Sequence, residues 1–261
     1  MGESGIKLAA LRRQVSGIEF RQAEAAARFA TGHPALDAAL GGGLAEGRLH
    51  ELFAASPEDA ASAAGFAAML ALRALEPGKA LLWLRTDNAE RRSGGFHAPG
   101  FAELGGNPDA ILLALAPDEV TLLRCAADAA RCAGLAVVVA ECWGSPPALD
   151  LTASRRLTLA AEKSGVTLLL LRVDAEAAPS AAETRWQVSA APSQALEANA
   201  PGPVAMDIEL LRRRAGPAGM RWRVEWDRDQ CSFREPALSG AMVPLPLGGP
   251  AADLPPLRRT A

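Results

Sequence analysis

Lysine is scarce in this chain. Among 261 residues only Lys7, Lys79 and Lys163 are lysines, so arginine carries most of the positive charge. A phosphate-binding nucleotide loop needs a lysine at a fixed position. With so few lysines, few places in the chain can meet this requirement. The net charge of −3 provides no general attraction to a polyanion. A contact with nucleic acid would therefore need a local cluster of arginines.

The sequence also lacks long uncharged apolar runs, and its cysteines show no regular spacing. No stretch reaches the roughly 18 to 20 apolar residues that span a bilayer, and the first residues, MGESGIKLAALRRQ, lack the apolar core of a signal peptide. We therefore expect a cytoplasmic protein without a membrane contact. The cysteines form no CxxC pair and have no histidine at ligand spacing, so we expect buried thiols and no metal or other cofactor. They are Cys125, Cys132, Cys142 and Cys231.

Hydrophobic residues, by contrast, make up 49% of the chain, enough for one large core domain. Continuous apolar runs of strand length alternate with helical patterns. Strands are expected at residues 49–53, 80–85, 110–115, 135–141 and 165–173, and helices at residues 57–75, 117–132 and 151–163. Buried strands separated by helices are typical of a parallel sheet covered on both faces. The sequence therefore predicts an α/β fold with a mostly parallel sheet.

Three regions are expected along the chain. Residues 1–30 carry apolar side chains at helical spacing among charged ones and predict an amphipathic N-terminal helical segment. Residues 31–234 are expected to form the core, with an irregular glycine-containing loop after residue 85. Because no helices separate them, residues 185–188, 205–213 and 220–226 are expected to be antiparallel strands at an edge of the sheet. Residues 235–261, rich in proline, glycine and alanine, predict a disordered tail.

The stretch ELFAASPEDAASAAGF stands where a strand leads into a helix, which is the position of a phosphate-binding loop. In that comparison Ala54 takes the place of the first glycine and Asp59 that of the second. Ala60 replaces the lysine, and Ala61 replaces the hydroxyl that holds magnesium. Glu58 and Asp59 would repel a triphosphate. The loop is therefore predicted to be degenerate.

A structural role explains the same stretch without a ligand. Ser56 could cap the helix, Pro57 suits its first turn, and the acidic residues that follow suit the positive end of the helix dipole. We favour this interpretation.

A resemblance to known proteins starts with the segment TGHPALDAALGGGLAEGRLHELF. It resembles the entry to the RecA-like core, with its pattern T-G-x-x-x-L-D-x-x-L-G-G-G-L-x-x-G-R. The segments LLWLR, LAVVVAE, SRRLTLAAEKSGVTLLLLR, AAETRWQVSAAPS and MDIELLRRRAGPAGMRWRVEWD resemble the ImuA family, RecA-related proteins of bacterial mutagenesis cassettes. The resemblance implies a RecA-like core of the P-loop NTPase type, here with a degenerate nucleotide loop.

The same resemblance implies a function. ImuA-type proteins are accessory factors in damage-induced, error-prone translesion DNA synthesis, as part of the SOS response. The implied partners are an ImuB-type Y-family polymerase homologue and an error-prone replicative-type polymerase, reached through ImuB. Contact with RecA and self-association remain open.

Three positions correspond to the working residues of RecA-type ATPases. By the resemblance, Asp87 lies near the carboxylate that activates water, Glu141 at the magnesium-linked acid, and Arg172 at a polar residue that couples nucleotide state to DNA. Without the lysine and the hydroxyl these groups have little to act on. We interpret them as structural and expect Arg172 to form an ion pair with Glu141 across neighbouring strand ends.

Partner contacts are predicted near the C-terminal end of the core. Arg212, Arg213 and Arg214 form a basic run, and Trp222 and Trp226 alternate with charged residues, so both would lie on one face of a strand. Tryptophan and arginine are enriched at binding hot spots. Packing of the two tryptophans onto the sheet is the alternative. Direct DNA binding stays open but weakly supported, because no aromatic ladder accompanies the arginines.

Three functions from different classes remain. The leading one is a non-catalytic RecA-like adaptor that assembles a translesion complex. The second is an ATP-dependent DNA-binding protein, which the missing lysine argues against. The third is an inhibitor of cell division related to SulA, another RecA-core relative without a working nucleotide site.

Overall fold

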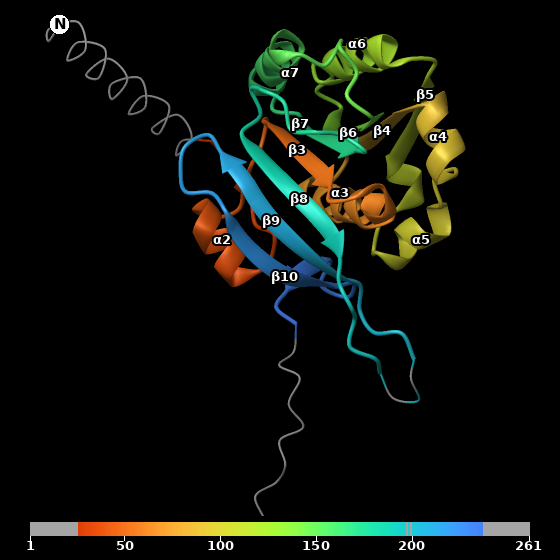
Figure 1. The fold of residues 1–261 in the computed structure, drawn as a ribbon, viewed down its shortest axis with the longest axis vertical. Coiled ribbons are helices and arrows are strands. Elements are labelled where there is room, and N and C mark those ends of the chain that lie inside the picture. The colour runs from red at the N-terminus through yellow and green to blue at the C-terminus, as the bar shows by residue number, and fades with distance from the viewer. Residues whose placement is uncertain (1–25, 197, 199, 237–261) are drawn as a thin grey trace, which may run out of the picture.

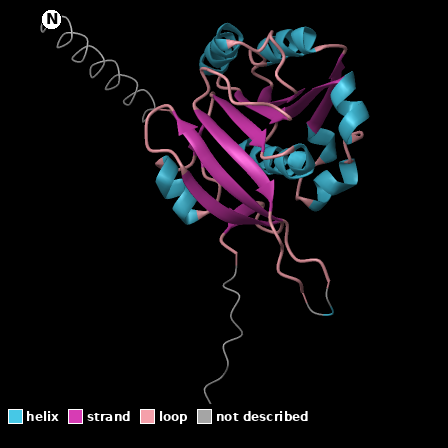
Figure 2. Ribbon diagram, in the orientation of Figure 1, coloured by secondary structure: helices cyan, strands magenta, loops and turns pink. Residues whose placement is uncertain are grey.

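The computed structural model describes residues 26–196, 198 and 200–236. A sheet of nine strands has helices on both sides, and a second sheet of two strands lies beside it (Figure 1, Figure 2). The strands are β1 (Arg28–Phe29), β2 (Leu44–Ala45), β3 (Leu49–Ala54), β4 (Ala80–Thr86), β5 (Ile111–Ala116), β6 (Leu135–Trp143), β7 (Thr167–Val173), β8 (Thr184–Ala190), β9 (Ala205–Arg213), β10 (Met220–Asp227) and β11 (Ser232–Arg234). The helices are α2 (Pro34–Leu40), α3 (Ala60–Ala74), α4 (Asp87–Ser93), α5 (Ala98–Glu103), α6 (Glu119–Ala129) and α7 (Leu151–Ser164), with short 3₁₀ turns η1 (Pro57–Asp59) and η2 (Pro108–Ala110).

The large sheet has the strand order β11-β10-β9-β8-β3-β7-β6-β4-β5. The strands from β8 to β5 in this order pair in parallel, whereas β9, β10 and β11 pair antiparallel at one edge. This confirms the predicted α/β fold, with a mostly parallel sheet and antiparallel edge strands. The prediction is wrong for residues 185–188, which were expected in the antiparallel edge: β8 lies inside the sheet and pairs in parallel with β3 and antiparallel with β9. Residues 174–183, which join β7 to β8, contain no helix, so no helical pattern indicated a parallel strand. The predicted parallel strands agree with the structure to within two residues at most ends. Strand β11 was not predicted, because three residues give no periodic signal.

Two hydrophobic cores lie on opposite faces of the sheet. On one face α3 packs through Phe66 and its alanines against side chains that include Leu52, Val139 and Trp186. On the other face α6 and α7 pack through residues such as Leu122 and Leu157 against the alternate side chains of the same strands. Strand β3 is buried along its whole length, since helices cover it on both sides.

The segment that carries the RecA-like pattern forms a clasp. The Asp37 carboxylate accepts hydrogen bonds from the Thr31 N–H at 2.8 Å and the Gly32 N–H at 3.0 Å. Gly32 has φ +97°, and a Cβ there would lie 2.6 Å from the Cβ of Ser232. The N–H of Phe233 donates to the Thr31 carbonyl at 2.9 Å. The pattern therefore joins the start of the described fold to its last strand.

Two predictions of local secondary structure are wrong. The loop expected after residue 85 contains the helices α4 and α5. Thr86 caps the first by accepting from the Ala89 N–H, and His97 Nδ1 caps the second by accepting from the Gly100 N–H. These local caps outweigh the glycines around them. Residues 28 and 29, placed in the N-terminal helical segment, form β1 instead. The rest of that segment, residues 1–25, and residues 237–261 of the predicted tail lie outside the described residues.

The cysteines differ in exposure. Cys142 is fully buried in β6, and burial raises the pKa of its thiol to about 12. Cys125 and Cys132 are exposed on and just after α6, so the expectation of buried thiols is wrong for these two. No helix in the described part of the chain combines the length and apolar character needed to cross a bilayer.

Candidate functional site

The predicted nucleotide loop lies between a strand and a helix, as the sequence indicated. Ala54 ends β3, and Ala60 and Ala61 begin α3. Between them the turn η1 contains Glu58 and Asp59. Neither lysine of the described residues belongs to this loop: Lys79 lies just before β4 and Lys163 near the end of α7. The turn between β3 and α3 therefore contains two acidic residues and is followed by two alanines.

Asp59 fixes the loop in place. Its Oδ2 accepts a hydrogen bond from the Ser56 hydroxyl at 2.8 Å, and its Oδ1 accepts one from the backbone N–H of Ala190 at 2.8 Å. Ser56 stands at the N-cap position of η1, but its side chain makes no capping bond, which corrects the predicted role. The carboxylate thus joins the start of α3 to the end of β8 and closes the loop internally.

A cavity of about 1070 Å³ opens beside this loop. The first half of α3, the ends of β4 and β6, the segment from α4 to α5 and the ends of β10 and β11 contribute to its walls. Aromatic side chains from several of these elements line it: Trp83, Phe96, Phe101, Trp143 and Trp226. Crevices at the carboxyl ends of parallel strands are the usual ligand sites of open α/β sheets. The surface of this one is more apolar than polar, and charged residues including Glu58, Arg92 and Arg234 also line it.

Glu141 forms a polar cluster in the wall of this cavity. Its carboxylate pairs with the Arg85 guanidinium at 3.0 Å and accepts from the indole N–H groups of Trp83 at 3.3 Å and Trp143 at 2.9 Å. Arg85 also donates to the carbonyl of Gly94 at 2.7 Å. The two charged side chains are almost completely buried. In this fold Glu141 thus has Arg85 as its charged partner.

The predicted ion pair between Arg172 and Glu141 is wrong. Strand register explains why: Arg172 lies opposite Cys142, whereas Glu141 lies opposite Arg85. Successive side chains point to opposite faces of a sheet, so Arg172 and Glu141 lie on different faces.

Arg172 makes other contacts on its own face. Its guanidinium lies 5.4 Å from the centre of the Phe53 ring and donates to the Gly144 carbonyl at 3.4 Å. Its Nε is buried without a hydrogen-bond partner among the described residues. Burial lowers the pKa of this guanidinium, although nearby Cys142 and Glu51 act in the opposite direction.

The third ATPase-like position does not join the cavity. Asp87 lies in the first turn of α4, where Thr86 rather than Asp87 provides the cap. Glu141 lines the cavity and Asp87 does not. The structure therefore does not bring the two carboxylates together in the cavity wall.

Most of the predicted partner residues take part in internal contacts. Arg212 donates to the Ser180 carbonyl at 3.0 Å, and Arg213 donates to two carbonyls at the end of α2, at 2.7 and 2.9 Å. Trp226 is buried and donates its indole N–H to the Leu104 carbonyl at 3.0 Å, while Trp222 is half-buried. Arg214 is exposed. The two tryptophans thus pack inward, and of the five residues only Arg214 is exposed.

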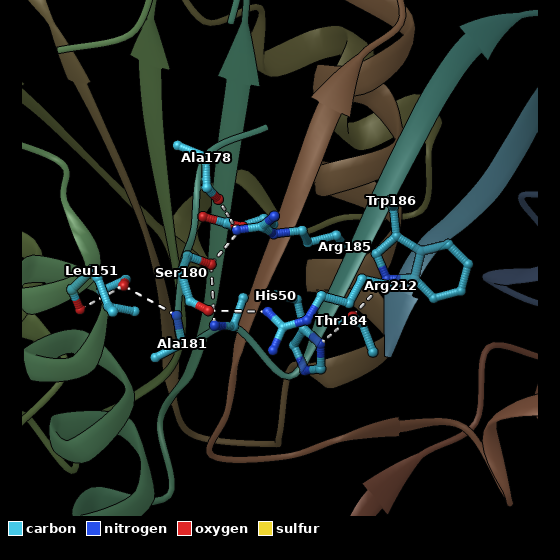
Figure 3. A network of polar contacts seen from close by, with 12 residues as sticks. His50, Leu151, Ala178, Ser180, Ala181, Thr184, Arg185, Trp186 and Arg212 are labelled. Atoms are coloured by element: carbon cyan, nitrogen blue, oxygen red, sulfur yellow. Dashed lines mark hydrogen bonds and ion pairs between the residues drawn. The ribbon is translucent and has the colours of Figure 1, made fainter. Parts of the chain in front are cut away.

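A buried polar network on the opposite face was missed by the sequence analysis (Figure 3). Glu51 in the middle of β3 pairs with Arg185 of β8 at 2.6 Å and accepts from the Ser180 hydroxyl at 2.8 Å. Arg185 also donates to the carbonyl of Ala178. The sequence signal was an acid inside a strand that is otherwise apolar, since such an acid needs a buried partner.

The histidines, to which no chemistry was assigned, have structural roles. His33 and His97 cap α2 and α5. His50 is buried, with Nδ1 2.7 Å from the Thr184 hydroxyl and Nε2 2.9 Å from the Ala45 carbonyl (Figure 3). Because a carbonyl only accepts, Nε2 carries the proton and Nδ1 accepts from Thr184. Burial, with nearby Arg28 and Arg48, lowers the pKa of His50 to about 4, against the Ala45 hydrogen bond.

In the described part of the chain, no three metal-ligating side chains gather where they could hold an ion. No protein-family model matches the chain. A solved structure of the RadB recombinase is similar in fold, with a TM-score of 0.52, covering 79% of this chain and 99% of that chain at 15% identity. The sheet, the strand-to-helix loop and this likeness define the class: an α/β protein with a RecA-like core.

Sequence comparison gives the family. The chain is 35% identical over 211 residues to Protein ImuA from two strains of Caulobacter vibrioides, covering 76% of this chain and 76% of each relative. The chain belongs to the ImuA family, as its motifs predicted.

Proposed function

We propose that this protein is a non-catalytic accessory factor of damage-induced, error-prone translesion DNA synthesis. It acts by protein contacts and assembles with an ImuB-type Y-family polymerase homologue. An error-prone replicative-type polymerase joins through that homologue. Membership of the ImuA family supports this role.

The observation that carries the proposal is the internal closure of the nucleotide loop. Asp59 has both carboxylate oxygens engaged, by Ser56 and Ala190. A triphosphate placed there would have to break these bonds, face two acidic side chains and do without a lysine. The RecA-like core therefore serves as a scaffold in this proposal.

The arginines of the C-terminal strands also favour protein contacts over DNA. Phosphate binding needs guanidinium groups that are free to reach a backbone. Arg212 and Arg213 are instead engaged with backbone carbonyls of their own chain. Burial lowers the pKa of Arg213.

Calorimetric titration tests the proposal. The purified full-length chain is titrated, in one buffer, with magnesium ATP, with single-stranded DNA and with a purified ImuB-type homologue. Saturable heat with the homologue and none with ATP is the expected result. Saturable ATP binding, or binding of DNA without binding of the homologue, would overturn the proposal in favour of an ATP-dependent or DNA-binding protein.

A further inference from the structure

Strand β5 exposes an unusual amount of apolar surface. Leu112, Leu113 and Leu115 are 53%, 56% and 52% exposed, and Val120 just after the strand is 45% exposed. The described part of the chain has eight exposed large hydrophobic residues, and these four lie within residues 112–120. Single exposed apolar residues are common, but a cluster marks an interaction site.

The cluster lies on a free sheet edge. Strand β5 ends the sheet, and among the described residues it pairs only with β4 (Figure 1). The outward-facing N–H and C=O groups of such a strand are available to another strand. Edge strands are usually protected by charged residues, proline or bulges, and the sequence of β5, ILLALA, contains no charge or proline.

Both faces of an added strand would meet leucine. In the register with β4, Leu113 lies opposite Trp83 and Leu115 opposite Arg85. Leu112 lies opposite Leu82, on the other face of the sheet. An incoming strand with apolar residues would therefore find apolar contacts on both sides as well as backbone hydrogen bonds.

The charges around β5 determine its partner. Asp109 precedes the strand, Asp118 and Glu119 follow it, and the sequence has no lysine or arginine between Arg92 and Arg124. Asp118 caps α6 by accepting from the Thr121 N–H at 2.7 Å, a bond that lowers the pKa of its carboxyl. A second copy of β5, parallel or antiparallel, would place acid against acid at both ends.

We propose that the β5 edge binds an extended segment of another protein that is apolar in its centre and carries lysine or arginine at both ends. The segment adds to the sheet beside β5. The proposal gives the adaptor role a binding surface and a partner of stated chemistry. The identity of the partner protein rests on the proposed function.

One double edge variant and one matched control test the assignment. Leu113→Lys combined with Leu115→Lys removes the apolar contacts and adds charges that repel a basic segment. The control is Leu159→Lys, because Leu159 is 65% exposed on α7, away from β5. Circular dichroism and thermal unfolding establish whether each variant is folded. Substitutions at exposed positions usually change stability little, so the variants are expected to fold.

The first measurement uses defined probes. Labelled peptides KRVTVTVRK and DEVTVTVED, which differ only in the charges at their ends, are titrated against each full-length protein by fluorescence anisotropy. The basic peptide should bind the wild type and Leu159→Lys. Its affinity for the edge variant should be lower by about tenfold or more. The affinity of the acidic peptide for the wild type should be lower than that of the basic peptide by a similar factor, and high salt should weaken binding of the basic peptide to the same degree. Equal binding to the edge variant, or none to the wild type up to about 1 mM, would overturn the proposal.

Two further outcomes separate this proposal from the proposed function. If the wild type binds the basic peptide at the edge but not the ImuB-type homologue, the edge assignment stands and the proposed partner is wrong. If the homologue binds all three proteins equally, the proposed function stands and the edge assignment is wrong. A dimer in sedimentation velocity that the edge variant abolishes would give the edge to a second copy and likewise overturn the assignment.

Discussion

Two buried ion pairs on opposite faces of the sheet invite comparison. Arg85 and Glu141 join β4 to β6, and Arg185 and Glu51 join β8 to β3, with N–O distances of 3.0 and 2.6 Å. In each pair an arginine on one strand meets a glutamate on its neighbour, and both acids are nearly inaccessible. The two pairs nevertheless have different surroundings.

The pair of Glu141 borders the aromatic cavity, and its carboxylate also accepts from two indoles. The pair of Glu51 is enclosed by the chain that joins β7 to β8, through Ser180 and the carbonyl of Ala178. Loss of a partner can be compensated more easily where water can enter than where the chain closes over the pair. The same kind of ion pair therefore lies in a cavity wall on one face of the sheet and is covered by a connecting segment on the other face.

The largest effect is expected at the sealed pair. Glu51→Ala leaves the Arg185 guanidinium buried without a carboxylate, which should cost about 3–5 kcal/mol of unfolding free energy. Equilibrium urea unfolding at neutral pH measures it. Glu209→Ala is the control, since Glu209 pairs with Arg221, an exposed arginine, and should cost less than about 1 kcal/mol. Similar losses in both variants would contradict the assigned importance of the sealed network.

A pH effect should follow from His50, the neighbour of Glu51 in β3, whose side chain points to the other face of the sheet. Its pKa is about 4 in the fold, below the ordinary histidine value of 6.5, so the folded state favours the neutral ring. Above pH 6.5 the ring is neutral in both states. As pH falls from about 6.5 to about 4 the unfolded chain takes up the proton first, and stability should drop by about 3 kcal/mol.

Urea unfolding at a series of pH values tests this, with His50→Gln as the comparison. The variant should lose that part of the pH dependence while keeping the part that comes from carboxyl groups. An unchanged pH profile in the variant would show that His50 does not titrate as the structure requires.

A smaller effect is expected at the cavity pair. Glu141→Gln keeps the shape of the side chain but leaves Arg85 without an anion, at a cost of about 1–3 kcal/mol. Arg85 retains its bond to the Gly94 carbonyl, and the cavity gives room for water. Trp83 and Trp143 lose a charged acceptor, so the tryptophan emission should shift. A loss larger than that of Glu51→Ala would reverse the comparison.

The smallest effect is expected at the loop between β3 and α3, beside the cavity. Asp59→Ala removes the acceptor of the Ala190 N–H at a partly exposed site, which should cost about 0.5–1.5 kcal/mol. Hydrogen exchange at Ala190 should become faster while exchange in β3 is unchanged. Unchanged exchange at Ala190 would show that Asp59 does not hold the loop closed.

The sequence predicted the sheet well because buried parallel strands are continuous apolar runs. LAVVVAE and GVTLLLLRV are such runs, and they correspond closely to β6 and β7. The strand-to-helix position of Ala54 and Ala60 was likewise predictable from the order of elements.

The pairing of charged residues was not predictable in the same way. Glu141 and Arg172 both stand at the ends of neighbouring strands, and only the register between β6 and β7 decides that they lie on opposite faces. A shift of one residue would have reversed the result. The cavity depends on α4 and α5 together with β10, which are distant in sequence, so no local pattern reveals it.

The clasp around Asp37 has a consequence for the synthesis of the protein. Thr31 and Gly32 are among the first described residues, yet they contact Phe233 and Ser232 near the end of the described fold. A ribosome delivers these partners late, after almost all of the sheet has emerged. The segment that best marks the family by its sequence is therefore one of the last to reach its final contacts, and a chain interrupted before β11 would leave it open.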